Sequence, residues 1–208
     1  MERRDLINQI CDNATDDASL IRFLTSDKFA FSQRFRVGSH LCYSVFPYLP
    51  YSSDIQPDID ERTARDVVMD FKKGISPGIY ADIVAAAILA EPDLKLPPET
   101  LLFHIPASTI EDDERRFRRF CSRLAQNLGI EDGFPLIELV MDRERSDMRR
   151  MTRLANGMIL MEDIAGRACL VVDDVYSSGR SFKQMADYLK SAGARSVTGV
   201  FLAKTVKR

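Results

Sequence analysis

Before residue 60, apolar residues recur mostly at helical spacing, with polar breaks between them. Residues 18–24 show this spacing, and residues 39–51 form an aromatic segment that ends at prolines. The pattern predicts an N-terminal helical region, residues 1–60, whose role the sequence does not indicate. Residues 48–60 are rich in Pro, Ser and Asp. We therefore expect them to form a loop that leads into a second domain, residues 61–208.

The pattern changes after a proline-containing break at residues 91–99. Before the break we expect helices at residues 61–75 and 77–90, the second of them nearly apolar and therefore buried. After the break, short apolar runs typical of buried strands alternate with segments of helical period. The predicted strands are residues 100–106, 135–141, 167–174 and 196–204, and the predicted helices are residues 111–130 and 181–193. This alternation predicts an α/β fold with a parallel sheet and right-handed crossovers.

Composition and charge narrow the functional classes. The 208-residue chain is 45% hydrophobic and 29% charged, as in ordinary globular proteins. Its net charge of −2 does not favour binding to nucleic acid. No apolar run reaches the roughly 20 residues that cross a bilayer, so we expect no membrane association. The polar N-terminus does not resemble a signal peptide, so we expect a cytoplasmic protein.

Cysteine and histidine usage does not indicate a metal site. The four cysteines form no C-x-x-C pair, and the two histidines lie far from them in sequence. We expect free thiols that pack as small hydrophobic groups. The residues concerned are Cys11, Cys42, Cys121 and Cys169, with His40 and His104.

Chemistry-bearing residues concentrate in the stretch VVDDVYSSGRSF, residues 171–182. An apolar strand leads into Asp173 and Asp174, a loop VYSSG follows, and a helix begins after it. Backbone N–H groups of such a loop, with the positive end of the next helix, form an anion site. Gly179 lets the backbone approach the anion closely. Additional hydroxyl donors are Ser177, Ser178 and Ser181.

Two carboxylates beside an anion site indicate a ligand with two different ends. A sugar phosphate fits, because the loop would hold its phosphate while Asp173 and Asp174 accept hydrogen bonds from its hydroxyls. The alternative is that the two acids only begin a turn and cap the next helix. The complete pattern, placed between a strand and a helix, favours the ligand site.

The stretch CLVVDDVYSSGRSF resembles the phosphoribosyl pyrophosphate (PRPP) binding motif of type I phosphoribosyltransferases. Within that superfamily the chain is most similar to ComF-type proteins. The similar segments are DFKKGISPGIYADIVAAAIL, LLFHIPAS, RRFRRFCSRLAQNLGI and TRLANG. ComF-type proteins often begin with a cysteine zinc finger, which this sequence lacks. Their RGFN segment corresponds to Arg115–Arg118, without its Gly and Asn.

The resemblance implies a type I phosphoribosyltransferase fold and an enzyme that transfers phosphoribosyl from PRPP to a nitrogen nucleophile, releasing pyrophosphate. Asp173 and Asp174 would be catalytic, since they could stabilise positive charge on the ribose ring. Mg²⁺ would be the cofactor, held mainly through PRPP or pyrophosphate rather than by protein ligands. The implied PRPP-binding residues are Val175, Tyr176, Ser177, Ser178, Gly179, Arg180 and Ser181, and the implied pyrophosphate loop is Ala107, Ser108 and Thr109.

Several alternatives remain open at this stage. Arg145 and Arg149 could clamp pyrophosphate from a hood over the site, or belong to a solvated charged face. His104 lies in a strand-like run, which favours a core histidine over a catalytic one. The chain could be a non-catalytic PRPP-binding regulator or a ComF-like protein linked to nucleic-acid processing. The acceptor is unidentified, and a homodimer is a possible assembly.

Overall fold

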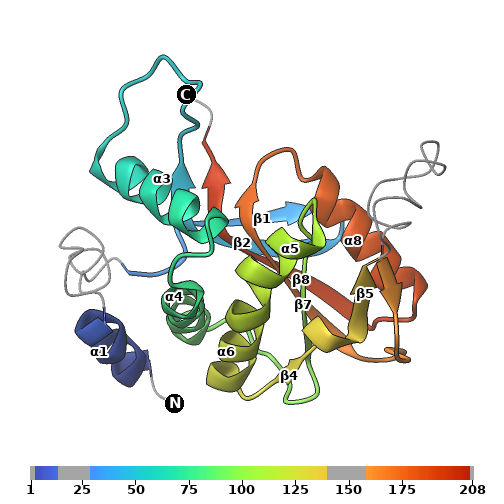
Figure 1. The fold of residues 1–208 in the computed structure, drawn as a ribbon. Coiled ribbons are helices and arrows are strands. Elements are labelled where there is room, and N and C mark those ends of the chain that lie inside the picture. The colour runs from blue at the N-terminus through green and yellow to red at the C-terminus, as the bar shows by residue number, and fades with distance from the viewer. Residues whose placement is uncertain (1–2, 14–28, 140–157, 207–208) are drawn as a thin grey trace.

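The chain folds around a six-stranded sheet in the order β1-β2-β8-β7-β3-β4, as shown by a computed structural model that describes residues 3–13, 29–139 and 158–206 (Figure 1). Only β1 runs antiparallel to its neighbour, and the other pairs are parallel. This mostly parallel sheet confirms the predicted α/β fold class. The strands are β1 Gln33–Val37, β2 His40–Tyr48, β3 Leu101–His104, β4 Glu131–Asp132, β7 Ala168–Tyr176 and β8 Ser196–Thr205.

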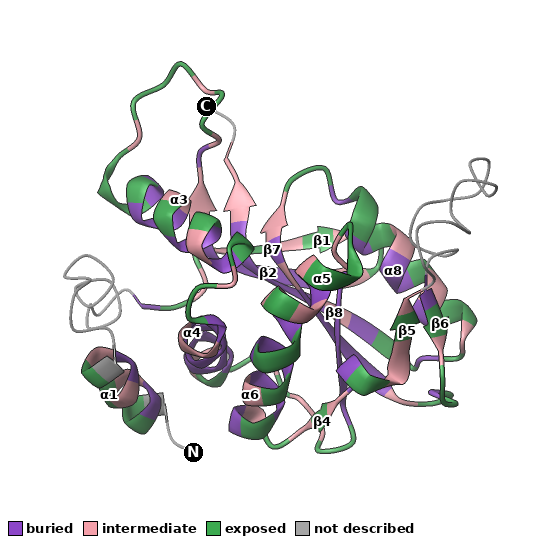
Figure 2. Cartoon of the chain, in the orientation of Figure 1, coloured by how far each residue is buried: buried purple, intermediate pink, exposed green. Residues whose placement is uncertain are grey.

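Helices cover both faces of this sheet, and the buried residues lie between the layers (Figure 2). Along β7, Leu170 and Val172 belong to the larger core with α1, α3, α4 and α6, whereas Val171 belongs to the core with α8. Alternate strand residues therefore serve opposite faces, as the strand period requires. The helices are α1 Arg3–Asn13, α3 Ile59–Lys72, α4 Pro77–Ala90, α5 Ile110–Asp113, α6 Arg119–Leu128 and α8 Arg180–Ser191.

The predicted helix at residues 111–130 is present as a continuous helical run with an irregular first part. Helix α5 passes into a π-helical segment, η1 Glu114–Arg118, before α6. The apolar side of this helical run is buried at Phe117, Phe120 and Leu124. Gly129, in the left-handed conformation, ends α6. Helices are also present near the predicted positions at α3, α4 and α8.

The N-terminal prediction of helices is wrong for residues 33–48. Helix α1 is present, but β1 and β2 form a hairpin, and β2 pairs with β8 over Cys42–Tyr48. Tyr43, Val45 and Phe46 are completely buried. A strand buried on both faces has a continuous apolar run instead of an alternating one, so period alone does not distinguish it from a buried helix.

The predicted strand at residues 135–141 does not join the main sheet. A short 3₁₀ turn, η2 Phe134–Leu136, precedes β5 Ile137–Leu139. β5 pairs antiparallel with β6 Met158–Leu160 in a separate two-stranded sheet. The edge position beside β3 belongs instead to the two-residue strand β4. In the described part of the chain, no helix combines the length and apolarity needed to cross a bilayer.

Candidate functional site

The predicted strand–loop–helix unit is present, with a shorter loop than expected. β7 continues through Val175 and Tyr176, which pair with Ala203 and Lys204 of β8. These two residues were expected in the loop, but the parallel pairing keeps them in the strand. The loop proper is Ser177–Gly179, and α8 begins at Arg180. The loop therefore lies at the carboxyl end of a central strand, where α/β folds place their ligands.

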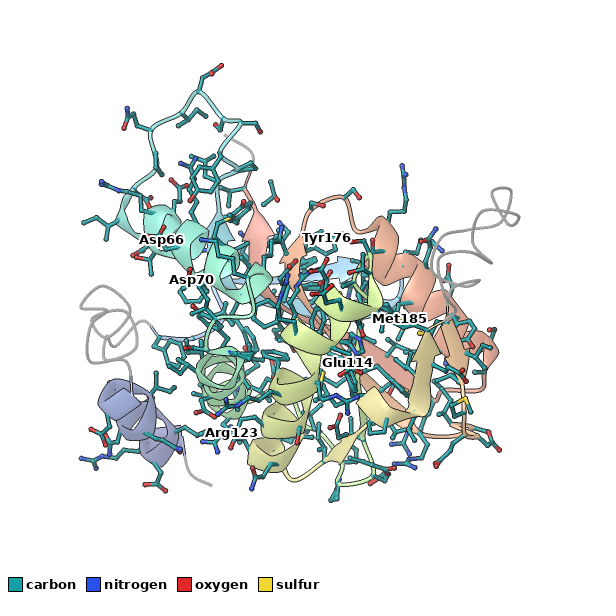
Figure 3. The ribbon with its side chains drawn as sticks, in the orientation of Figure 1. Asp66, Asp70, Glu114, Arg123, Tyr176 and Met185 are labelled. Atoms are coloured by element: carbon teal, nitrogen blue, oxygen red, sulfur yellow. The ribbon has the colours of Figure 1, made fainter. Side chains whose placement is uncertain are left out.

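Gly179 is required by its backbone conformation and by its surroundings. Its φ of +74° lies in the left-handed region, where a side chain is strained. A Cβ at this position would also collide with the Tyr176 hydroxyl group. The Tyr176 ring cannot move away easily, because it packs against Phe35 at 4.6 Å and Phe201 at 5.1 Å between ring centroids. Figure 3 shows Tyr176 at this end of the sheet.

Asp173 and the loop line the same small cavity. The cavity has a volume of about 30 Å³ and includes Asp173, the loop residues and the first turn of α8. This is far below the roughly 300–1,000 Å³ of enclosed ligand pockets. Ser177, Ser178 and Arg180 are exposed around it. The arrangement is thus an open cradle in which a ligand would remain largely at the surface.

Asp174 is buried and already has a cationic partner. It is 6% exposed and forms an ion pair with Arg116 of the π-helical segment η1. The Arg116 guanidinium lies 5.2 Å from the ring centroid of Phe117 and 5.8 Å from that of Phe71. The sequence alone does not indicate this contact, because Arg116 lies 58 positions from Asp174 and is one of several neighbouring arginines.

Asp173 has a carboxyl group whose charged form is disfavoured. Burial raises its pKa well above the ordinary value, and the neighbouring charge of Asp174 raises it further. A hydrogen bond from the Asp174 N–H to Asp173 Oδ1, at 2.8 Å, lowers the pKa of Asp173. The positive charges of Arg116 and Lys72 also lower it. A ligand that donates hydrogen bonds to this carboxylate would stabilise its charged form.

The predicted pyrophosphate loop lies beside this site. The Ile105 N–H donates to the Val172 carbonyl at 3.0 Å, which holds the end of β3 against β7. Ala107, Ser108 and Thr109 follow and lead into α5. Thr109 is the N-cap, because its Oγ1 accepts a hydrogen bond from the Asp112 N–H at 3.1 Å. The loop thus precedes a helix N-terminus, as an anion-binding segment requires.

A buried carboxylate fixes the shape of that loop. Asp113 Oδ1 accepts a hydrogen bond from the Ala107 N–H at 2.6 Å, and its Oδ2 lies 2.8 Å from His104 Nε2. His104 is 1% exposed and stacks between Phe117 and Phe134. This supports the interpretation of His104 as a core residue. Sequence reasoning gave Asp113 no role.

The structure does not describe the predicted hood, and it shows free cysteines. Arg145 and Arg149, the predicted hood, lie outside the described residues. Among the residues that the structure does describe, no group of three or more His, Cys, Asp or Glu side chains could hold a metal ion. All four cysteines are free, and Cys42, Cys121 and Cys169 are buried.

Comparison with known proteins finds a family match for the C-terminal part of the chain. Residues 118–207 match the model of a family described as phosphoribosyl transferase domain. The matched segment contains α6, β7, the glycine loop, α8 and β8. No curated protein matches the chain. The ComF-type subfamily stays a prediction. The matched segment is fewer than half of the 208 residues, so the comparison shows that this part of the chain is similar to a phosphoribosyl transferase domain. The mostly parallel sheet is consistent with the fold of that domain.

Proposed function

We propose that this protein binds PRPP at the carboxyl end of β7 and transfers its phosphoribosyl group to a nitrogen nucleophile, with release of pyrophosphate. The observation that carries the proposal is the shared lining of one cradle by Asp173 and the Ser177–Gly179 loop at the N-terminus of α8. The phosphoribosyl transferase match covers this unit and supports phosphoribosyl transfer in general terms.

The loop and the acids would bind opposite ends of the phosphoribosyl group. Backbone N–H groups at the start of α8 would hold the 5′-phosphate, assisted by the hydroxyls of Ser177, Ser178 and Ser181. Asp173 would accept hydrogen bonds from the ribose hydroxyls, which favours its charged form. The ion pair with Arg116 holds the Asp174 carboxylate in place before the ligand binds.

The segment Ala107–Thr109 would receive the pyrophosphate. The Ala107 N–H is already bonded to Asp113, so it orients the loop instead of binding the ligand. The Thr109 hydroxyl accepts a hydrogen bond from Asp112 and keeps its own hydrogen for donation.

During transfer, the bond between ribose C1 and the pyrophosphate oxygen lengthens, and positive charge develops on the ribose ring. Carboxylates close to the ring stabilise this charge. Mg²⁺ would neutralise negative charge on the departing pyrophosphate. With no cluster of three acidic or histidine ligands in the described residues, the ion would be held mainly through PRPP oxygens, and Asp173 is a carboxylate that lines the same cradle.

A pyrophosphate-release assay tests the transfer step. The protein is incubated with PRPP, Mg²⁺ and a panel of nucleobases, amines and ammonia, and pyrophosphate is measured with a coupled enzyme. We expect release that requires both PRPP and one acceptor class. PRPP binding without release by any acceptor would contradict the transferase and identify a PRPP-binding regulator. Absence of PRPP binding would contradict both the transferase and the PRPP-binding regulator.

A further inference from the structure

A second and much larger cavity lies between the helices α1, α4 and α6. Its volume is about 680 Å³, and it is an open groove, because half of its lining residues are exposed: Ser76, Arg118, Arg119, Ser122 and Gln126. It is lined by residues of α1, α4, η1 and α6, and none of its lining residues also lines the cradle at the glycine loop. Figure 3 shows Arg123 between α4 and α6. The cavity is therefore separate from the proposed PRPP site.

The lining of this cavity is cationic. Arg118, Arg119 and Arg123 contribute to it, against a single carboxylate, Asp82. Arg123 neutralises Asp82 through contacts of 2.8 and 3.3 Å, and Asn127 donates to the same carboxylate at 2.6 Å. Asp82 is only 4% exposed, and both Arg123 and Asn127 hydrogen-bond to its carboxylate. It therefore offers little repulsion to an anion.

Arg119 provides a positive charge that is not paired with any residue the structure describes. Arg118 pairs with Glu114, but Arg119 forms no hydrogen bond or ion pair with any residue in the described part of the chain. Arg119 and Arg123 are four residues apart on one helix, so they lie on the same side of α6. Two guanidinium groups at this spacing can bind separate anionic groups of one ligand.

The first turn of α4 also lines the cavity. Ser76, its N-cap, makes no side-chain capping bond, and Gly78 follows in the lining. A Cβ placed on Gly78 would lie 3.7 Å from Arg119 Nε, so the arginine lies directly over this helix start. The positive end of α4 and the Arg119 charge therefore act on the same space.

We propose that this cavity binds a small molecule with several anionic groups, of the class of nucleoside polyphosphates, at a site distinct from the PRPP cradle. The volume exceeds what a single phosphate would fill. Arg119 and the Nη1 group of Arg123, which Asp82 does not contact, supply donors from α6, and the α4 N-terminus supplies donors from a second wall. Ser122 and Gln126 add neutral polar groups on α6 that suit the remainder of such a ligand.

Calorimetric titration with ATP at moderate salt tests this site. We expect one equivalent of ATP to bind the parent protein, and the charge-reversing change Arg119→Glu to weaken binding at least tenfold. The control is Arg195→Glu, because Arg195 is an exposed arginine that pairs with Glu99, and neither residue lines the cavity. That variant should bind ATP within twofold of the parent. Circular dichroism would verify that both variants are folded.

A third variant separates this site from the proposed PRPP site. Gly179→Ala disrupts the glycine loop and should leave ATP binding unchanged. If Gly179→Ala abolished ATP binding while Arg119→Glu preserved it, ATP would occupy the PRPP cradle and the proposal would be wrong. Absence of ATP binding to the parent would also overturn it. The result does not depend on whether the protein binds PRPP.

Discussion

At the scale of single residues, Asp173 combines a proposed functional role with a cost in stability. Its folded-state pKa lies well above the ordinary Asp value, because burial and Asp174 disfavour its charge. At any pH between the pKa of Asp173 in the unfolded state and its higher pKa in the folded state, the folded state binds more protons than the unfolded state. The free energy of unfolding therefore falls as pH rises through this window, and the loss persists at neutral pH.

We predict that Asp173→Asn stabilises the protein at neutral pH. Asn keeps the oxygen that accepts the Asp174 N–H but carries no charge. The gain in melting temperature over the parent should be largest at pH 7 and shrink as pH falls toward the ordinary Asp pKa of about 3.9. Asp187→Asn serves as control, since Asp187 is exposed and its ion-pair partner in the described part of the chain is the exposed Lys183. A lower melting temperature for Asp173→Asn at pH 7 would contradict the account.

Gly179 permits a test of the glycine loop with a well-matched control. Gly179 and Gly166 have φ values of +74° and +75°, but only a Cβ at Gly179 would meet other atoms within 4 Å. Both Ala variants should lose about 1 kcal/mol from backbone strain. Only Gly179→Ala should also lose binding of ribose 5-phosphate, measured by calorimetry. Equal affinities in the two variants would show that the loop is merely a turn.

The residues that the sequence could identify are those that belong to one short motif. Asp173, Asp174 and Gly179 lie within seven positions, so their relation is visible in the chain itself. The pair between Arg116 and Asp174 joins residues 58 positions apart. It depends on how η1 packs over the sheet, and no local pattern distinguishes Arg116 from its neighbouring arginines.

At the scale of elements, Asp113 links β3 to the loop that follows it. Replacing Asp113 with Ala would leave His104 Nε2 and the Ala107 N–H without their partner. A buried polar group without a partner costs about 1–3 kcal/mol, so the total loss should be roughly 2–6 kcal/mol. Urea unfolding measures this loss. Asp112→Ala, which removes a solvent-accessible ion pair with Arg115, should cost under about 1 kcal/mol. Similar losses for the two variants would contradict a positioning role for Asp113.

Periodicity predicted some elements and failed for others for a physical reason. The run at residues 111–130 is amphipathic, because α6 has one face on the core and one in solvent. Its 3.6-residue period is therefore visible. β2 is buried on both faces and leaves no such alternation. The position of β5 depends on its partner β6, some 20 residues away, which sequence reasoning did not connect to it.

At the scale of the whole molecule, the N-terminal hairpin is part of the main sheet. β2 lies between β1 and β8, and its residues Tyr43, Val45 and Phe46 belong to the larger core. The alternation of strands and helices after residue 100 predicted the parallel core. It did not indicate that an earlier segment would extend the sheet, because that position is set by pairing with the last strand.

We predict that a chain beginning at residue 49 does not fold cooperatively. It would lack β1 and β2, expose the pairing edge of β8 and leave part of the core open. Urea unfolding followed by circular dichroism should show a broad, non-cooperative change, while the full chain unfolds in one transition. A sharp transition with the midpoint of the full chain would show that the hairpin is dispensable for the fold.

The most direct test of the central claim is the affinity for PRPP, measured by calorimetry with Mg²⁺ on the parent, Asp173→Asn and Asp187→Asn. We expect the parent and Asp187→Asn to bind PRPP with equal affinity. Asp173→Asn, which removes charge-assisted hydrogen bonds to the ribose, should bind about 10–100-fold more weakly, in line with a loss of roughly 1.5–3 kcal/mol. If Asp173→Asn bound PRPP as tightly as the parent, the cradle at the end of β7 would not be the PRPP site.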